Sequence, residues 1–316
     1  MKVIPLAADS LGVRSMATYV ECGRTSVLVD PGASLGVNRF NLPPADEEWE
    51  ALRRANDRIA AYAGRTAVIF ISHYHEDHFR YDRTIYVDRT VWAKDPKRMV
   101  GARQAERAAL LWKGLDGACR LDVAEGRRLE TPDAVLTASP PLGHGLDGGA
   151  LGYVVALTVS DRREGERFVH ASDVQGPLSP VATAYLIRER PTLLYLSGPP
   201  AYLESQIGAA LVDQGMANLQ RIMEATGCRV ILDHHAIRAE NYRERFGRLW
   251  ETGRVVTAAE FIGQADAPLE AWRRRLWGAR RKTPAPMRGR RLPSVPPSAI
   301  MNPRTAPKPA KEGTTE

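Results

Sequence analysis

Residues 69–79 read IFISHYHEDHF, so a short apolar run is followed directly by three histidines and an aspartate. The β-branched and aromatic run predicts a buried β-strand. In extended backbone alternate side chains point the same way, so His73 and His75 can converge on one ion, and a turn can direct Asp77 and His78 toward another. Imidazole and carboxylate donors together suit zinc, and also iron or manganese. The stretch predicts a metal site at the end of a strand.

Three later segments offer further ligands in a chain that has only seven histidines. His144 lies between two glycines, which let the backbone turn tightly and bring the imidazole close to a metal. Asp173 follows a predicted strand, where it is either a ligand or an aspartate that caps a turn or helix. His234 and His235 follow another predicted strand and are preceded by Asp233. We expect one histidine of this pair to be a ligand.

The HxHxDH run, a lone histidine, a strand-end aspartate and a late histidine, in that order, resemble the metallo-β-lactamase superfamily over roughly residues 1–260. The resemblance implies an α/β (α+β) fold, a four-layer αββα sandwich with its site at one edge of the sheets. It implies these ligands: His73, His75 and His144 for one metal, Asp77, His78 and a late histidine for the other, and Asp173 between them. The SHYHEDH segment, the helical insertion before it and YLSGPPAYL resemble an uncharacterised archaeal branch of predicted metallo-hydrolases in that superfamily.

The late ligand is more specifically indicated by residues 234–238, which read HHAIR. This string resembles the His-Phe-Ser-x-Arg string of the phosphodiesterase and tRNA-processing branch, which favours His234 as the ligand. His235 then supports a ligand or contacts substrate, although it stays an alternative ligand. Asp233 or Glu76 can orient a ligand imidazole, and Asp77 can also handle protons as a catalytic residue.

The expected cofactors are two divalent cations, with zinc preferred over iron or manganese. Such a pair can hold a water as hydroxide near neutral pH and polarise the bond that the hydroxide attacks. We therefore expect a binuclear metal-dependent hydrolase acting on a phosphodiester or another small ester. One alternative is an RNA or DNA nuclease that uses a basic C-terminal tail, and another is a non-catalytic metal-binding scaffold or sensor. Arg39, Lys94 and Lys97 lie in predicted loops, where they either contact an anionic substrate or are simply solvated.

The formal charge of +7 is concentrated at the C-terminus of the 316-residue chain. Residues 280–316 hold nine of the 44 basic residues and two of the 37 acidic ones, which leaves 35 of each sign before them. This stretch is rich in proline and poor in large apolar residues, so it predicts a disordered basic tail after one domain over residues 1–279. Such a tail either contacts nucleic acid by counterion release or only aids solubility.

Hydrophobic periodicity predicts a mixture of strands and helices. Strands are expected at residues 3–6, 18–21, 26–29, 67–71, 135–138, 152–159, 168–171, 193–196 and 230–232. Helices are expected at residues 46–63, 95–112, 204–225, 242–250 and 269–277.

The three cysteines are widely spaced and form no CxxC pattern, so neither a disulfide framework nor a thiolate zinc site is indicated. No segment reaches the roughly 18 apolar residues of a membrane helix. We expect a soluble cytoplasmic protein with no membrane partner, and the sequence does not specify how many chains assemble.

Overall fold

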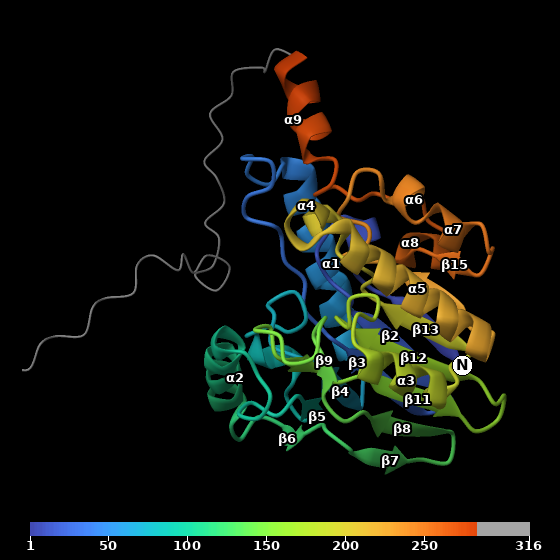
Figure 1. The fold of residues 1–316 in the computed structure, drawn as a ribbon. Coiled ribbons are helices and arrows are strands. Elements are labelled where there is room, and N and C mark those ends of the chain that lie inside the picture. Colours follow the sequence, from blue (N-terminus) through green and yellow to red (C-terminus); the bar gives the residue numbers. More distant parts are fainter. Residues whose placement is uncertain (283–316) are drawn as a thin grey trace, which may run out of the picture.

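The computed structural model describes residues 1–282, in which two β-sheets pack face to face and helices cover their outer sides (Figure 1). Helix α9 (Arg273–Lys282) is the last described element and includes the first three residues of the predicted tail. The remainder of that tail, residues 283–316, lies outside the described residues. The division of the chain at residue 280 therefore stays a prediction.

The first sheet has six strands in sequence order, beginning antiparallel and continuing parallel from the third strand. The strands are β1 (Lys2–Pro5), β2 (Thr18–Cys22), β3 (Thr25–Val29), β4 (Val68–Ile71), β5 (Thr90–Ala93) and β6 (Arg120–Val123). Helix α1 (Asp46–Ala63) connects β3 to β4, and α2 (Ala102–Leu115) connects β5 to β6. Parallel neighbours require crossovers of this kind.

The second sheet has seven strands in the order β15-β14-β13-β12-β11-β8-β7. Their bounds are β7 (Arg128–Glu130), β8 (Ala134–Ala138), β11 (Leu157–Asp161), β12 (Arg167–Ser172), β13 (Leu193–Leu196), β14 (Arg229–Leu232) and β15 (Val255–Val256). The last four run parallel, with helices α3 (Pro180–Glu189) and α5 (Ala209–Thr226) in two of their crossovers. A separate pair, β9 (Leu142–Gly143) and β10 (Tyr153–Val154), lies beside it.

Side chains of single strands divide between the layers because successive residues point to opposite faces. In β4, Ile69 and Ile71 join the core beneath α1 and α2, whereas Val68 and Phe70 join the core between the sheets. In β14, Ile231 faces the inter-sheet core and Val230 faces the helices. Strands buried on both faces read as continuous apolar runs. These three cores confirm the expected αββα sandwich.

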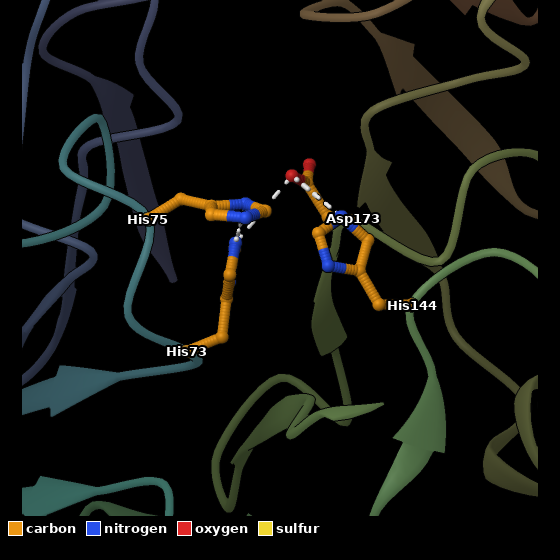
Figure 2. A group of neighbouring side chains, drawn as sticks. All are labelled: His73, His75, His144 and Asp173. Atoms are coloured by element: carbon orange, nitrogen blue, oxygen red, sulfur yellow. Dashed lines mark hydrogen bonds and ion pairs between the residues drawn. The ribbon is translucent and has the colours of Figure 1, made fainter. Parts of the chain in front are cut away.

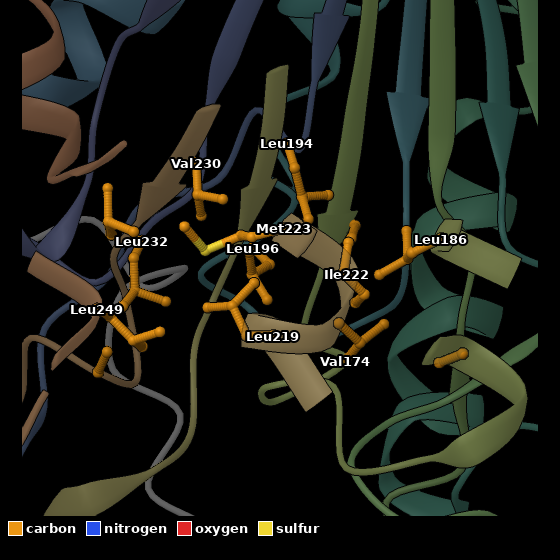
Figure 3. Packing of buried hydrophobic residues seen from close by; sticks show 14 of the residues in the cluster. Val174, Leu186, Leu194, Leu196, Leu219, Ile222, Met223, Val230, Leu232 and Leu249 are labelled. Atoms are coloured by element: carbon orange, nitrogen blue, oxygen red, sulfur yellow. The ribbon is translucent and has the colours of Figure 1, made fainter. Parts of the chain in front are cut away.

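The core outside the second sheet is formed largely by α5 and the strands beneath it (Figure 3). Leu219, Ile222 and Met223 of α5 pack with Leu194 and Val230 of the sheet, and all five are fully buried or nearly so. Full burial of such side chains contributes about 1.5–3 kcal/mol each relative to exposure. This packing fixes β12, β13 and β14, whose ends carry later parts of the site.

Helix α1 matches its predicted range of residues 46–63, whereas the other four predicted helices differ in their bounds or are divided. The segment predicted as one helix at residues 204–225 is α4 (Glu204–Ile207) and α5, separated by Gly208 with φ 87°. The helix predicted from residue 95 begins at Ala102. The carboxylate of Asp95 accepts from the N–H groups of Lys97 and Arg98, at 2.8 and 3.0 Å, which favours a turn over helix.

Other elements also depart from the predicted bounds. The segment at residues 152–159 is two strands, because β10 pairs with β9 whereas β11 pairs with β8 and β12. The segment at 242–250 is α6 (Tyr242–Arg245) and α7 (Gly247–Trp250), and α9 begins four residues later than predicted. Helix α3 had no prediction, although Ser179 caps it and proline begins it.

Short elements complete the described chain: the 3-10 turns Asp9–Leu11, Arg83–Ile85 and Ala201–Leu203, and helix α8 (Ala258–Phe261). Within residues 1–282 no helix combines the length and apolar character needed to cross a bilayer.

Candidate metal centre

The predicted ligands meet at one edge of the two sheets because each follows the end of a strand. The loop after β4 carries His73, His75, Asp77 and His78, and His144 follows β9. In the second sheet, Asp173 follows β12, and His234 lies two residues beyond β14. Ligands of open α/β sheets bind at such carboxyl ends of parallel strands.

A first group comprises His73, His75, His144 and Asp173, whose ligand atoms all lie within 4.8 Å of one another (Figure 2). Nε2 of His73 is 3.1 Å from Nδ1 of His75. Oδ2 of Asp173 is 3.5 Å from Nε2 of His73 and 3.3 Å from Nε2 of His144. Donors at 2.0–2.2 Å from a tetrahedral zinc lie roughly 3.4 Å apart, so this spacing suits an ion of that size.

A second group comprises Asp77, His78 and His234. Nε2 of His234 is 3.5 Å from Oδ2 of Asp77, and Nε2 of His78 is 3.9 Å from Oδ1 of Asp77. Asp173 reaches this group too, with Oδ2 3.5 Å from Nε2 of His78 and Oδ1 3.5 Å from Nε2 of His234. One carboxylate therefore borders both groups.

Buried polar atoms in the centre also fit bound cations. Nε2 of His78 and Oδ1 of Asp173 are buried without a hydrogen-bond partner among the described residues. A buried polar atom left in this state costs about 1–3 kcal/mol. Coordination to a cation would remove that cost for both, so the residues present fit a metal site.

The protonation states of His73, His75 and His234 suit metal binding. Burial lowers the pKa of His73 to about 4, of His75 to about 2 and of His234 to about 3, so each is neutral at neutral pH. Burial acts in the same direction on His78, but Asp173 and other carboxylate contacts raise its pKa well above 6.5. Groups that stabilise a proton on an imidazole nitrogen would equally stabilise a metal cation placed there.

Asp30, which directly follows β3, forms hydrogen bonds with the candidate ligand His78 and with Ser72. Its Oδ2 accepts a 2.9 Å hydrogen bond from Nδ1 of His78, which directs Nε2 toward the second group. Asp30 also accepts from the N–H and hydroxyl of Ser72, both at 2.7 Å, and that hydroxyl is 2.9 Å from Nδ1 of His73. Burial opposes ionisation, but contacts with His78 lower the pKa of Asp30. Asp30 was not among the predicted site residues, and its only local signal is an aspartate directly after an apolar strand.

Asp9 has the corresponding role for His234. Its Oδ2 accepts from Nδ1 of His234 at 2.7 Å, and its Oδ1 accepts from Nε of Arg238 at 2.8 Å. Nη2 of Arg238 donates a hydrogen bond to Oδ2 of Asp77 at 3.3 Å. Burial raises the pKa of Asp9 to about 7, against the opposing charge of Arg238. Asp9 was also missed, since it lies 225 positions from the histidine it contacts.

The remaining predicted site residues occupy distinct positions around the centre. His235 stacks on His234, and its Nε2 is 3.7 Å from Oδ2 of Asp173, longer than the corresponding distance for His234. Asp233 accepts from the backbone N–H groups of Ser10, His234 and Ala258, at 3.1, 2.7 and 2.9 Å, so it fixes the loop carrying both histidines. Glu76 is exposed and lies 3.6 Å from Arg107.

Backbone conformation at three strand ends is unusual. Asp30, Ser172 and His234 have φ values of 48°, 48° and 56°. Non-glycine residues rarely adopt this left-handed region, and its cost of about 1–3 kcal/mol persists only where the surroundings enforce it. All three residues are fully buried within or beside the centre, so the strain lies where the ligands are positioned.

Comparison with known proteins gives the family. No protein-family model matches the chain. The UPF0282 protein of Methanopyrus kandleri is 40% identical over 294 residues, which cover 88% of this chain and 99% of the relative. The chain belongs to the UPF0282 family. The family's Thermococcus gammatolerans protein is 39% identical, covering 87% of this chain and 95% of its own.

Solved structures place the UPF0282 chain in a known fold. Tm1679, described as a metal-dependent hydrolase of the β-lactamase superfamily, matches with TM-score 0.51 and 16% identity, covering 81% of this chain and 94% of its own. Unliganded yeast PDE1 matches with TM-score 0.51 and 12% identity, covering 81% and 97%. The chain therefore has the metallo-β-lactamase fold, as its HxHxDH run predicted.

Proposed function

We propose that this UPF0282 protein is a binuclear metal-dependent hydrolase that cleaves a phosphodiester or another small ester. The observation that carries the proposal is the position of Asp173, whose oxygens lie 3.3–3.5 Å from imidazole nitrogens of both ligand groups. Buried atoms without partners on His78 and Asp173 support it independently. The description of Tm1679 as a metal-dependent hydrolase agrees with the reaction class.

In this proposal His73, His75 and His144 would hold one cation, and Asp77, His78 and His234 would hold the other. Asp173, which lies near both groups, would contribute to both sites, and His235 would contact substrate or support a ligand. A set of imidazoles and carboxylates suits zinc first, with iron and manganese as alternatives. When bound, such a pair of ions supplies a nucleophile from water near neutral pH and polarises the ester.

Of the two candidate carboxylate ligands Asp77 is the more exposed, with a side chain 14% exposed, whereas Asp173 is 1% exposed. Burial opposes its ionisation, but His78, His234 and Arg238 lower the pKa of Asp77 well below its usual value. Asp77 is therefore ionised at neutral pH, as both a ligand and a proton acceptor must be. Arg238, 3.3 Å away, restrains the orientation of Asp77.

The test is metal content combined with turnover. Protein purified without a metal-affinity tag would be analysed by mass spectrometry and assayed with bis-p-nitrophenyl phosphate. We expect about two zinc, iron or manganese ions per chain. We expect Asp173→Ala to lose metal and activity, and Asp77→Ala to lose turnover by a factor on the order of 100 or more. Asp57→Ala, at an exposed position on α1, is the matched control.

Protein that neither carries nor takes up metal would overturn the binuclear site. Protein that binds two ions but cleaves neither this diester nor a panel of carboxylic and phosphoric esters would overturn the hydrolase assignment alone.

A further inference from the structure

Beside the metal centre, three arginines come close together, and only one of them lacks a carboxylate. Arg14 forms a two-pronged pair with Glu270, with both N–O distances 2.6 Å. Arg238 is held by Asp9 and Asp77. Within residues 1–282, Arg39 forms no ion pair with an acidic side chain, and its Nε is buried without a hydrogen-bond partner. Its one polar contact, from Nη2 to the carbonyl of Arg238 at 3.3 Å, leaves most of the guanidinium free.

Two aromatic rings, those of Tyr202 and His235, connect Arg39 to the candidate metal ligand Asp173. Its guanidinium carbon lies 5.2 Å from the ring centroid of Tyr202. The ring of Tyr202 lies 6.1 Å from that of His235, whose Nε2 is 3.7 Å from Asp173. The guanidinium of Arg238 also faces Tyr202, at 5.6 Å. Tyr202 thus lies beside both His235 of the candidate centre and the guanidinium of Arg39.

The backbone that presents Arg39 is a strained two-residue turn. The N–H of Arg39 donates to the carbonyl of Leu42 at 3.1 Å, and the N–H of Leu42 donates to the carbonyl of Arg39 at 3.0 Å. Between them, Phe40 and Asn41 both have φ 58°. Asparagine tolerates this conformation, but phenylalanine adopts it at a cost of about 1–2 kcal/mol. Strain of this kind persists where the surroundings fix a functional group in place.

The electrostatic environment favours an anion at this point. Burial and the charges of Arg14 and Arg238 act to lower the pKa of Arg39, and its net shift is downward despite Glu270 and Tyr202. The positive charge is thus only partly compensated by the protein. A planar guanidinium with free N–H groups matches the paired oxygens of a carboxylate or phosphate.

We propose that Arg39, stacked on Tyr202, binds an oxyanion of the substrate beyond the scissile bond, so that the preferred ester carries a second anionic group. This inference rests on the proposed function and specifies its substrate class. The shared chemistry is a terminal carboxylate or phosphate on the arm of the ester that points toward Tyr202. The arm ends at Arg39 while the scissile group lies at the metal ligands.

The experiment uses three p-nitrophenyl phosphodiesters whose second arm ends in a methyl group, a carboxylate or a phosphate. We expect Arg39→Gln to raise KM for one or both anionic arms by about 10- to 100-fold and to leave the methyl arm within about twofold. The arm with the larger change identifies the anion. Arg39→Lys, which keeps charge but not the planar fork, should recover part of the loss. Arg65→Gln is the control, because Arg65 also faces a tyrosine ring, at 5.4 Å from Tyr62.

Equal KM values for the three arms in wild type, or equal effects of Arg39→Gln on all three, would overturn the inference. If wild type cleaves none of the diesters, the proposed phosphodiester activity fails, and calorimetric titration with uncleavable phosphonates carrying the same arms still tests Arg39. Tighter binding of an anionic arm that is lost in Arg39→Gln and retained in Arg65→Gln would support the anion site. Identical affinities in all proteins would exclude it.

Discussion

Asp30 Oδ2 accepts a 2.9 Å hydrogen bond from Nδ1 of His78, and this contact joins the end of one strand to the metal-binding loop of the next. The carboxylate takes further hydrogen bonds from Ser72, directly after β4, and from Ser172, the last residue of β12. Its position makes Asp30 the side chain that fixes which nitrogen of His78 faces the other candidate ligands. Loss of a residue that hydrogen-bonds to a metal ligand in this way typically lowers metal affinity by about 10- to 100-fold.

We predict that Asp30→Asn weakens metal binding by about 10- to 100-fold, because the amide turns a donor toward at least one group that itself donates. Competition with a chromophoric chelator measures the affinity. Asp57→Asn on α1 serves as the control for loss of one negative charge. Unchanged affinity in Asp30→Asn would mean that Asp30 stabilises the fold without orienting His78.

Gly32 is predicted to be intolerant of even one added carbon. A Cβ at this position would lie 2.3 Å from the backbone nitrogen of Phe79 and 2.6 Å from the carbonyl carbon of His78. Backbone cannot swing aside as a flexible side chain does, so Gly32→Ala should cost about 1–3 kcal/mol of unfolding free energy and displace His78. Urea unfolding and metal stoichiometry measure the two effects.

Gly114 within α2 is the matched control, because an added Cβ there meets no atom within 4 Å. Gly114→Ala should be neutral or stabilising by up to about 1 kcal/mol, since alanine favours helix. Similar effects of both substitutions would show that β3 and the metal loop do not depend on close approach.

The two adjacent histidines are expected to differ in their effect on metal content. Nε2 of His234 lies 3.5 Å from both Asp77 and Asp173, whereas His235 approaches only Asp173, at 3.7 Å, among these two carboxylates. We therefore predict that His234→Ala retains about one ion per chain and that His235→Ala retains about two. Mass spectrometry after dialysis gives the stoichiometry. Loss of an ion in His235→Ala alone would reverse the assignment of the late ligand.

Much of the site was predictable because its signal is local. The run from Ile69 to His78 combines a strand buried on both faces with ligands at short spacing, and both features can be read within ten residues. The order of the later ligands completed the resemblance to the metallo-β-lactamase superfamily, and that resemblance implied the fold. Local spacing specifies a site well when the chain itself brings the donors together.

The supporting residues were not predictable, because their partners are distant in sequence. Asp30 lies 48 positions from His78, and Asp9 lies 225 positions from His234. Arg39 gives a similar lesson, because its environment is completed by Tyr202 from the opposite sheet's loop. By contrast, Lys94, which like Arg39 was expected either to contact an anionic substrate or to be solvated, has a fully buried side chain that pairs with Glu125 at 2.7 Å. Burial decided between these two loop cations, and burial depends on the whole fold.

Acid is expected to lower the free energy of unfolding, partly because it protonates the carboxylate of Glu270. The side chain of Glu270 is 9% exposed and pairs with Arg14 at 2.6 Å. Although burial opposes ionisation, hydrogen bonds and charge from Arg14 lower the pKa of Glu270 to about 2. Because the folded pKa lies below the ordinary 4.5, the contribution is complete above pH 4.5 and is lost as pH falls toward 2. The shift corresponds to about 3 kcal/mol.

We predict that the difference in unfolding free energy between wild type and Glu270→Gln shrinks by about that amount from pH 6 to pH 2. Denaturant titrations at several pH values measure it, with Glu251→Gln at an exposed position as the control. A difference that is constant across this range would show that the Arg14–Glu270 pair is no source of acid sensitivity.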